Sequence, residues 1–249
     1  DEDFCFEEFA DRVAELVEKY VDIDRLLELT KQVAPAALPM SVSHRTYRRE
    51  PSFTVAIARD PAFNFMYEAN IRYLHHLGEV TYFSPLADTS LPDAGFVYLP
   101  GGYPELYLAA LSANRPMLQS IRRYVENGGK LLAECGGMMY LCDEIRDKNG
   151  DVFPMVGVLH QSATMENMKL RLGYRTLLYN DARLKGHEFH YSRLVEQQDP
   201  LPSCAVAYTA KGVKTDTPLY RYKNVLAGYT HLYWADPAGN DWFTKFIIK

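Results

Sequence analysis

The sequence predicts an α/β fold: a mostly parallel central sheet with helices on both faces, preceded by a short helical segment. From residue 53 onward, short apolar runs typical of buried strands alternate with helical segments. One strand ends at a cysteine followed by two glycines, and another ends close to a second Gly-Gly pair. In parallel sheets the functional site lies at the carboxyl ends of the strands, which is where both glycine pairs fall.

Composition excludes several classes of function. The chain has 249 residues, 47% of them hydrophobic, enough for one large domain or a domain with an appendage. A net charge of −5 provides no basic field for nucleic acid or anionic lipid, and no apolar run could span a bilayer. The four cysteines have neither CxxC nor metal-ligand spacing. We therefore expect no metal, no nucleic-acid or membrane partner, and a reducing cytoplasm.

The first fifty residues differ from the rest. Residues 6–31 predict helices with an apolar face, formed in the first helix by Phe9, Val13, Leu16, Val17 and Tyr20. Residues 33–51 combine an Ala-Pro-Ala-Ala-Leu-Pro run with a basic cluster, as is typical of a linker. We expect three parts: a helical tail of an upstream domain at 1–32, the linker at 33–51 and the main domain at 52–249.

The main domain is expected to alternate strands and helices and to become β-rich after residue 151. Apolar runs predict strands at residues 53–58, 79–84, 95–99 and 130–134. Helices are predicted at residues 64–77, 116–127 and 240–248, the second of which ends at a glycine pair that suits a helix stop. Further strands are predicted at residues 170–179, 186–194 and 205–211.

Cys135 is the candidate nucleophile. It stands between strand 130–134 and a helical segment, the arrangement of a nucleophile elbow, with the small residues Ala133 and Gly137 on either side. The N-terminus of the following helix favours a thiolate, so we expect a lowered pKa for this thiol. The alternative is a buried structural cysteine, since free cysteines are commonly buried.

A second glycine pair lies in the segment Leu99-Pro-Gly-Gly-Tyr-Pro-Glu105, directly after a predicted strand. Glycines let backbone N–H groups approach a ligand closely. Beside an elbow, the N–H groups of Gly102 and Gly136 would hold the negative oxygen of a tetrahedral intermediate. The alternative is an ordinary Gly-Gly turn.

A cysteine nucleophile needs a base that is near in space. His231, in the apolar segment 226–233, is the candidate, and a structural core histidine is the alternative. His187 and His190 resemble a zinc motif, but HExxH requires one more residue and a helix. On a strand these two histidines would point to opposite faces, so we expect no metal there.

Four motifs together resemble a known family. They are a PGGYPE loop at 100–105, an AECGGMMYL elbow at 133–141, a GHEFHYS strand at 186–192 and a late Gly-Tyr-x-His at 228–231. In this order they are similar to the glutaminase domain of the cobyrinic acid a,c-diamide synthase family, a branch of the triad-type (class I) glutamine amidotransferases. Residues 58–67 are also similar to the opening of that domain. The resemblance covers about residues 53–235.

The resemblance implies an enzyme, a carbon–nitrogen ligase that takes its amide nitrogen from glutamine. The leading helices resemble the end of the family's ATP-dependent ligase domain. ATP and Mg²⁺ are expected in that upstream domain, and no cofactor is expected in this chain. The acceptor implied is a corrin, cobyrinic acid, which would be amidated at its a and c carboxylates. The residues implied are Cys135 and His231 for catalysis, Gly102 and Gly136 for the oxyanion hole, and Gly101, His190 and Tyr191 for the glutamine site.

The sequence departs from the family at two places. Most triad enzymes have a glutamate two residues after the histidine, where Tyr233 stands here, although the corrin branch often lacks that acid too. No G-x-x-x-x-G-K-[ST] motif is present. We therefore expect that this chain is a truncated protein, and that the missing upstream domain holds the ATP site. The acceptor could instead be another tetrapyrrole-type acid, such as a nickel sirohydrochlorin. Two other functions stay open: a cysteine hydrolase without ammonia transfer and an inactive docking domain. A homodimer also stays open.

Overall fold

The structure is a computed structural model that describes residues 6–31, 53–196, 200–235 and 240–248. It divides into two compact units, Asp1–Thr46 and Tyr47–Lys249. The linker predicted at 33–51 lies outside the described residues. None of the described helices is both long enough and apolar enough to cross a membrane.

The first unit contains the two helices predicted for residues 6–31, α1 (Phe6–Tyr20) and α2 (Ile23–Lys31). Acidic residues in the first turn of α1 and Lys19 in its last turn match the helix dipole. The chain turns between the helices at Asp22, whose carboxylate accepts the N–H of Arg25 at 2.9 Å and so caps α2. No described residue of either helix is buried, so the apolar face of α1 forms no core within its own unit.

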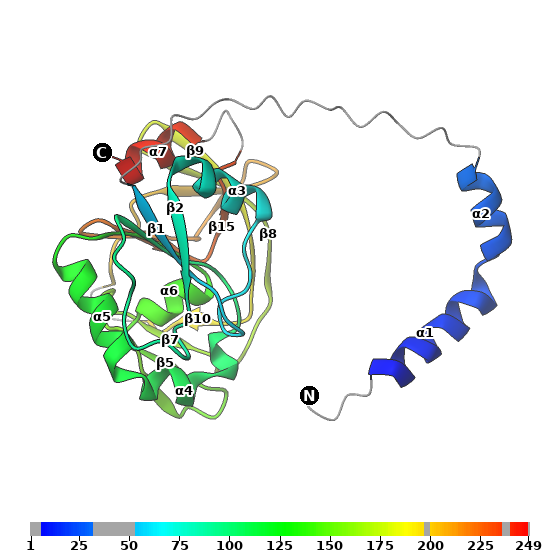
Figure 1. Ribbon diagram of the computed structural model, residues 1–249, viewed down its shortest axis with the longest axis horizontal. Helices are drawn as coiled ribbons and strands as arrows, with labels where there is room; N and C mark the ends of the chain where they lie inside the picture. Colours follow the sequence, from blue (N-terminus) through cyan, green and yellow to red (C-terminus); the bar gives the residue numbers. More distant parts are fainter. Residues whose placement is uncertain (1–5, 32–52, 197–199, 236–239, 249) are drawn as a thin grey trace. The chain divides into compact units, whose positions relative to one another are not determined.

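The second unit is organised around a six-stranded sheet in the order β13-β14-β4-β3-β1-β2. Figure 1 labels β1 and β2, at one edge of this sheet. The strands from β14 to β2 are parallel, and β13 is antiparallel to β14. This confirms the predicted α/β class with a mostly parallel sheet. The strands are β1 (Thr54–Ala58), β2 (Glu79–Phe83), β3 (Phe96–Leu99), β4 (Lys130–Glu134), β13 (Leu219–Tyr222) and β14 (Val225–Gly228).

Each face of this sheet is covered by its own hydrophobic core. Alternate residues of a strand enter different cores: in β1, Ala56 and Ala58 belong to one core and Ile57 to the other. Helices pack on both faces, as predicted. The first core takes residues from α4 (Leu108–Ala113), α5 (Arg115–Glu126) and α6 (Gly136–Leu141), the second from α3 (Glu68–Leu77) and α7 (Asn240–Ile248).

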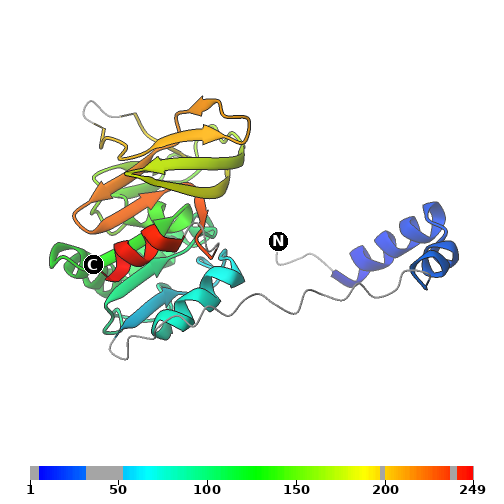
Figure 2. The same ribbon diagram turned by 90° about the horizontal axis from the view of Figure 1, so that it is seen from above.

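The β-rich part forms two further sheets. A five-stranded antiparallel sheet, β12-β11-β8-β9-β15, contributes Leu177, Leu184 and Leu232 to the second core and lies beside the central sheet (Figure 2, yellow to orange). A smaller sheet has the order β10-β7-β5-β6. The strands are β5 (Glu144–Arg146), β6 (Val152–Pro154), β7 (Ser162–Thr164), β8 (Arg171–Tyr179), β9 (Ala182–His190), β10 (Arg193–Leu194), β11 (Val206–Thr209), β12 (Lys214–Thr215) and β15 (His231–Tyr233).

Several predicted bounds are wrong, including those of the strand predicted at 205–211, which is β11 and ends at Thr209. The helix predicted from residue 64 begins at Glu68, because the preceding residues form turns and bridges. Asp60 Oδ1 accepts the N–H of Ala62 at 2.8 Å, and Phe65 N–H donates to Gly101 O at 3.0 Å. The strand predicted at 186–194 is two strands, since β9 begins earlier, at Ala182, and ends at His190, and β10 begins at Arg193. The Phe65–Gly101 bond ties this early segment to the predicted glycine loop.

Candidate active site

Cys135 lies at the turn between β4 and α6, as predicted. Its backbone has φ 48° and ψ −108°, a strained conformation for a residue with a side chain. The turn is held by its own backbone: Cys135 N–H donates to Gly228 O at 2.8 Å, and Met139 N–H donates to Cys135 O at 3.0 Å. A Cβ at Gly137 would overlap Leu99 O, so glycine is required where the elbow passes β3. The structure therefore forms a nucleophile elbow at this cysteine.

The glycine loop after β3 touches both the elbow and the predicted base. A Cβ on Gly136 would lie 3.2 Å from Gly102 N, so these two backbones are adjacent, as an oxyanion hole built from their N–H groups requires. A Cβ on Gly101 would overlap the imidazole of His231. Gly101 thus makes room for the histidine.

The strand that carries His231 is held from both sides. Within the described part of the chain, β15 is an edge strand that pairs with β9 alone. On its other edge, Glu134 Oε1 accepts the N–H of Leu232 at 3.0 Å, and Asn70 Nδ2 donates to Leu232 O at 2.8 Å. Because Glu134 precedes Cys135 and Leu232 follows His231, these bonds link the residues next to the predicted nucleophile and base.

Glu134 is a buried acid, 2% exposed, that the sequence analysis did not identify as functional. Its Oε2 accepts the O–H of Tyr98 at 2.7 Å. Burial raises the pKa of the Glu134 carboxyl to about 8, although its two hydrogen bonds act in the opposite direction. At neutral pH this group is therefore mostly protonated, and it supports β15 through hydrogen bonds more than through charge.

The predicted thiolate at Cys135 is not what the structure supports. Burial raises the pKa of the Cys135 thiol to about 12, and the charge of Glu105 adds to the effect. The N–H of Gly136 lowers this pKa, and no other described residue does so. The thiol is 5% exposed and α6 has six residues, so burial outweighs the helix terminus. The prediction of a low pKa is wrong for this reason.

His231 is buried as well, at 4% exposed. Burial, then the neighbouring His187 and His190, lowers the pKa of its imidazole to about 3. Its ring stacks on His187 with centroids 5.0 Å apart, and the Phe65 ring lies 4.5 Å away. Its Nδ1 has no hydrogen-bond partner among the described residues. At neutral pH the site therefore holds a neutral thiol and a neutral imidazole.

A small pocket of about 20 Å³ opens in front of Cys135. It brings the nucleophile together with Gly102 and with the predicted glutamine-site residues His190 and Tyr191. Gly101 and His231 are not among its lining residues. The lining residues are Gly102, Tyr103, Glu105, Cys135, Met139, Phe189, His190, Tyr191 and Ser192.

His190 forms a fixed wall of this pocket. Its ring stacks on Tyr229 with centroids 3.8 Å apart, and its Nδ1 lies 2.9 Å from Ser192 O. Ser192 Oγ in turn donates to the Tyr229 hydroxyl at 3.1 Å. His187 points to the opposite face of β9, as predicted, where its Nδ1 lies 2.5 Å from the Tyr67 hydroxyl. In the described part of the chain, no three His, Cys, Asp or Glu side chains are grouped to hold a metal.

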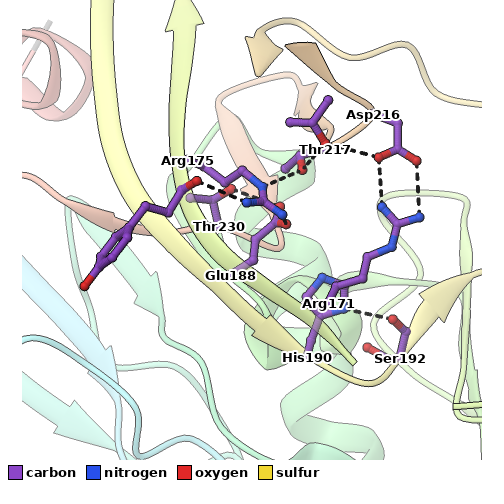
Figure 3. Close-up of polar contacts among 10 residues, drawn as sticks. Arg171, Arg175, Glu188, His190, Ser192, Asp216, Thr217 and Thr230 are labelled. Carbon is purple, nitrogen blue, oxygen red and sulfur yellow. Dashed lines mark hydrogen bonds and ion pairs between the residues drawn. The ribbon is translucent and has the colours of Figure 1, made fainter. Parts of the chain in front are cut away.

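A polar network next to His190 holds β8 and β9 in place (Figure 3). Glu188, 1% exposed, has its Oε2 2.7 Å from Arg175 Nη2, an ion pair without hydrogen-bond geometry. Arg175 Nε also donates to Thr217 Oγ1 at 3.2 Å, and Thr230 Oγ1 donates to Glu188 Oε1 at 3.5 Å. Because Thr230 directly precedes His231, this buried ion pair helps to place the predicted base.

A second, larger pocket of about 910 Å³ lies on the His187 side of β9. Tyr233, which stands where most triad enzymes have an acid, lines this pocket and is 40% exposed. Its other lining residues are Tyr67, Leu172, Gly173, Tyr174, Lys185, Gly186 and His187.

Comparison with known proteins identifies the same family as the sequence motifs. The CobB/CobQ-like glutamine amidotransferase domain model matches residues 54–239. A cobyrinate a,c-diamide synthase of Dehalococcoides mccartyi is 37% identical over 246 residues, which is 91% of this chain and 52% of that protein. A hydrogenobyrinate a,c-diamide synthase of Stutzerimonas stutzeri is 37% identical over 226 residues, 88% of this chain and 52% of that protein. The chain spans about half the length of these relatives.

The fold is also found in a solved structure. A crystal structure of a glutamine amidotransferase superimposes with a TM-score of 0.51 and 17% identity, over 78% of this chain and 99% of that one. At this identity the likeness concerns the fold alone. The family model, however, covers most of the sequence and includes the elbow, the glycine loop and the late histidine. The chain therefore belongs to the CobB/CobQ-like glutamine amidotransferase family.

Proposed function

We propose that this domain hydrolyses glutamine to glutamate and ammonia, and that the ammonia amidates the a and c carboxylates of a cobyrinic-acid-type corrin. The observation that carries the proposal is the pocket in which Cys135, at a strained elbow, meets Gly102 and His190. Membership of an amidotransferase family supports glutamine as the substrate. The names of the relatives support the corrin acceptor.

The chemistry follows from the residues around the elbow. Cys135 Sγ attacks the side-chain carbonyl carbon of glutamine, and the thiol proton passes to His231. The oxygen that becomes negative is held by the N–H groups of Gly102 and Gly136. His231 then gives its proton to the leaving nitrogen, so ammonia departs and a glutamyl thioester remains. Water attacks the thioester with His231 as base, which releases glutamate and restores the thiol.

The acceptor chemistry requires a second domain. A carboxylate does not condense with ammonia in water unless it is activated first, and this sequence has no G-x-x-x-x-G-K-[ST] loop for ATP. We infer an upstream ATP-dependent ligase domain of the same protein, which holds ATP and Mg²⁺ and the corrin. The compartment we propose is the cytoplasm, because the nucleophile must remain a reduced thiol.

The test measures glutamine hydrolysis and amidation of the acceptor separately. The 249-residue chain, alone and with the ligase domain added, is assayed for glutamate formation, with Cys135→Ser as the inactive control. With ATP, we expect diamide from cobyrinic acid and none from nickel sirohydrochlorin. Amide on the latter would point to the other tetrapyrrole acceptor, and glutamine hydrolysis with no amide on either would favour a plain cysteine hydrolase. If no glutamate forms even with the ligase domain present, the proposal fails.

A further inference from the structure

Among the described residues that line the pocket in front of Cys135, Glu105 is the one with an acidic side chain, and it has no role in the mechanism above. It lies in the short 3₁₀ helix Pro104–Leu106, directly after the glycine loop. Since Gly102 of that loop is adjacent to the elbow, Glu105 is held at a fixed place relative to the nucleophile.

The carboxylate of Glu105 acts directly on the nucleophile. Among the charges that raise the pKa of the Cys135 thiol, Glu105 is the largest, ahead of Glu134 and Glu188. Glu105 and Cys135 line the same small pocket, so the carboxylate lies close enough to the sulfur for its charge to act there.

Among the described residues, no cation is paired with this carboxylate. Glu134 is satisfied by Tyr98 and Leu232, and Glu188 is paired with Arg175. Within the described residues, the hydrogen bond that affects the pKa of Glu105 comes from its own backbone N–H, and burial raises that pKa. A half-buried carboxylate without a cation is unfavourable, and its position beside the thiol opposes thiolate formation. An arriving cation would relieve both effects.

The proposed substrate carries such a cation. In glutamine, three carbon atoms separate the α-ammonium group from the amide carbon that Cys135 attacks. We propose that Glu105 binds the α-ammonium group of glutamine and thereby selects amides of α-amino acids. The inference rests on the proposed function and names the residue that recognises the α-amino-acid end of glutamine. Binding also neutralises the negative charge beside the sulfur, so recognition of the correct substrate favours attack by Cys135.

The test compares two reagents that alkylate Cys135 in the 249-residue chain. 6-Diazo-5-oxo-L-norleucine has the amino-acid head of glutamine, whereas iodoacetamide has none. Modification of the Cys135 peptide is followed by mass spectrometry at low reagent concentration. In Glu105→Gln we expect the rate with the diazo compound to fall roughly 10- to 100-fold, as for loss of one charge-assisted contact. The rate with iodoacetamide should not fall, because a negative charge beside the thiol has been removed.

Two further variants control the test. Glu105→Asp keeps the charge on a shorter side chain, so it should lose less of the diazo rate than Glu105→Gln. Glu126→Gln removes an exposed acid that is paired with Lys223 outside the pocket, so it should change neither rate. Unfolding temperatures of all variants show whether the fold is kept.

The outcomes separate the inference from the function on which it rests. An unchanged diazo rate in Glu105→Gln, or an equal loss with both reagents, would overturn the role of Glu105. If the wild-type chain neither reacts with the diazo compound at Cys135 nor hydrolyses glutamine with the ligase domain present, the proposed function itself fails. If the wild type and Glu105→Gln react equally fast with the diazo compound, the role of Glu105 is refuted and the proposed function stands.

Discussion

Replacing Glu134 by glutamine should change how stability depends on pH. The carboxyl has an ordinary pKa of 4.5, and burial raises it to about 8 in the folded protein. Because the folded pKa is the higher one, the contribution of this group to stability is complete below pH 4.5 and is lost as the pH rises through about 8. The full loss is about 5 kcal/mol, since one pKa unit corresponds to about 1.36 kcal/mol. Glutamine does not ionise, so Glu134→Gln should not show this loss.

The measurement is urea unfolding of the wild type and Glu134→Gln at several pH values between about 5 and 9. The free energy of unfolding of the wild type should fall relative to the variant by several kcal/mol across this range. Glu134→Gln should therefore be the more stable protein at the alkaline end. If the two proteins keep a constant difference at every pH, the carboxyl is not held protonated by burial and the reasoning is wrong.

Activity tests the support of His231 by the same side chain. The amide of Glu134→Gln can accept the N–H of Leu232 and donate to the Tyr98 hydroxyl, so glutaminase activity at neutral pH should stay within a few-fold. Glu134→Ala leaves the Leu232 N–H buried and unpaired, which costs about 1–3 kcal/mol and loosens β15. Its kcat should fall more than its KM rises, because the base is misplaced while the pocket remains. A full kcat in Glu134→Ala would contradict this role.

Three further predictions follow from the protonation states and the sequence. His231→Ala should lower glutaminase activity by about two to four orders of magnitude with unchanged circular dichroism, whereas His187→Ala should keep much of it; the reverse result would move the base to His187. Iodoacetamide should label the half-buried Cys204 faster than Cys135, because the pKa of the Cys135 thiol is raised to about 12. Peptide mass spectrometry measures the two labelling rates, and the opposite order would support a thiolate at Cys135. Calorimetry should detect no ATP binding by residues 1–249, and stoichiometric binding would contradict the need for a separate ligase domain.

The parts of the fold and site that depend on local sequence were predictable. A strand that stops at a cysteine before two glycines has few conformations open to it, and Cys135 does lie in a strained elbow. The opposite orientation of His187 and His190 follows from the two-residue period of a strand and needs no knowledge of the rest of the fold.

Contacts between distant parts of the chain were not predictable. The bonds that hold Leu232 come from residues 98 and 162 positions earlier in the chain, and no spacing rule indicates either partner. Burial of Cys135 also depends on long-range packing, whereas the prediction of a lowered pKa used only the adjacent helix terminus. The acid of the PGGYPE loop belonged to a quoted motif, but its place in the lining of the Cys135 pocket required the structure.

The two protonation states together constrain how the site can react. Burial opposes a thiolate at Cys135 and an imidazolium at His231, so a stable ion pair between them is disfavoured from both sides. Attack on an amide avoids that state, because the negative charge moves from sulfur to an oxygen next to the N–H groups of Gly102 and Gly136. The positive charge on His231 lasts only until the departing nitrogen takes the proton. Proton transfer and attack must therefore occur together, and a reagent that needs a preformed thiolate should react slowly with a site that turns over its own substrate.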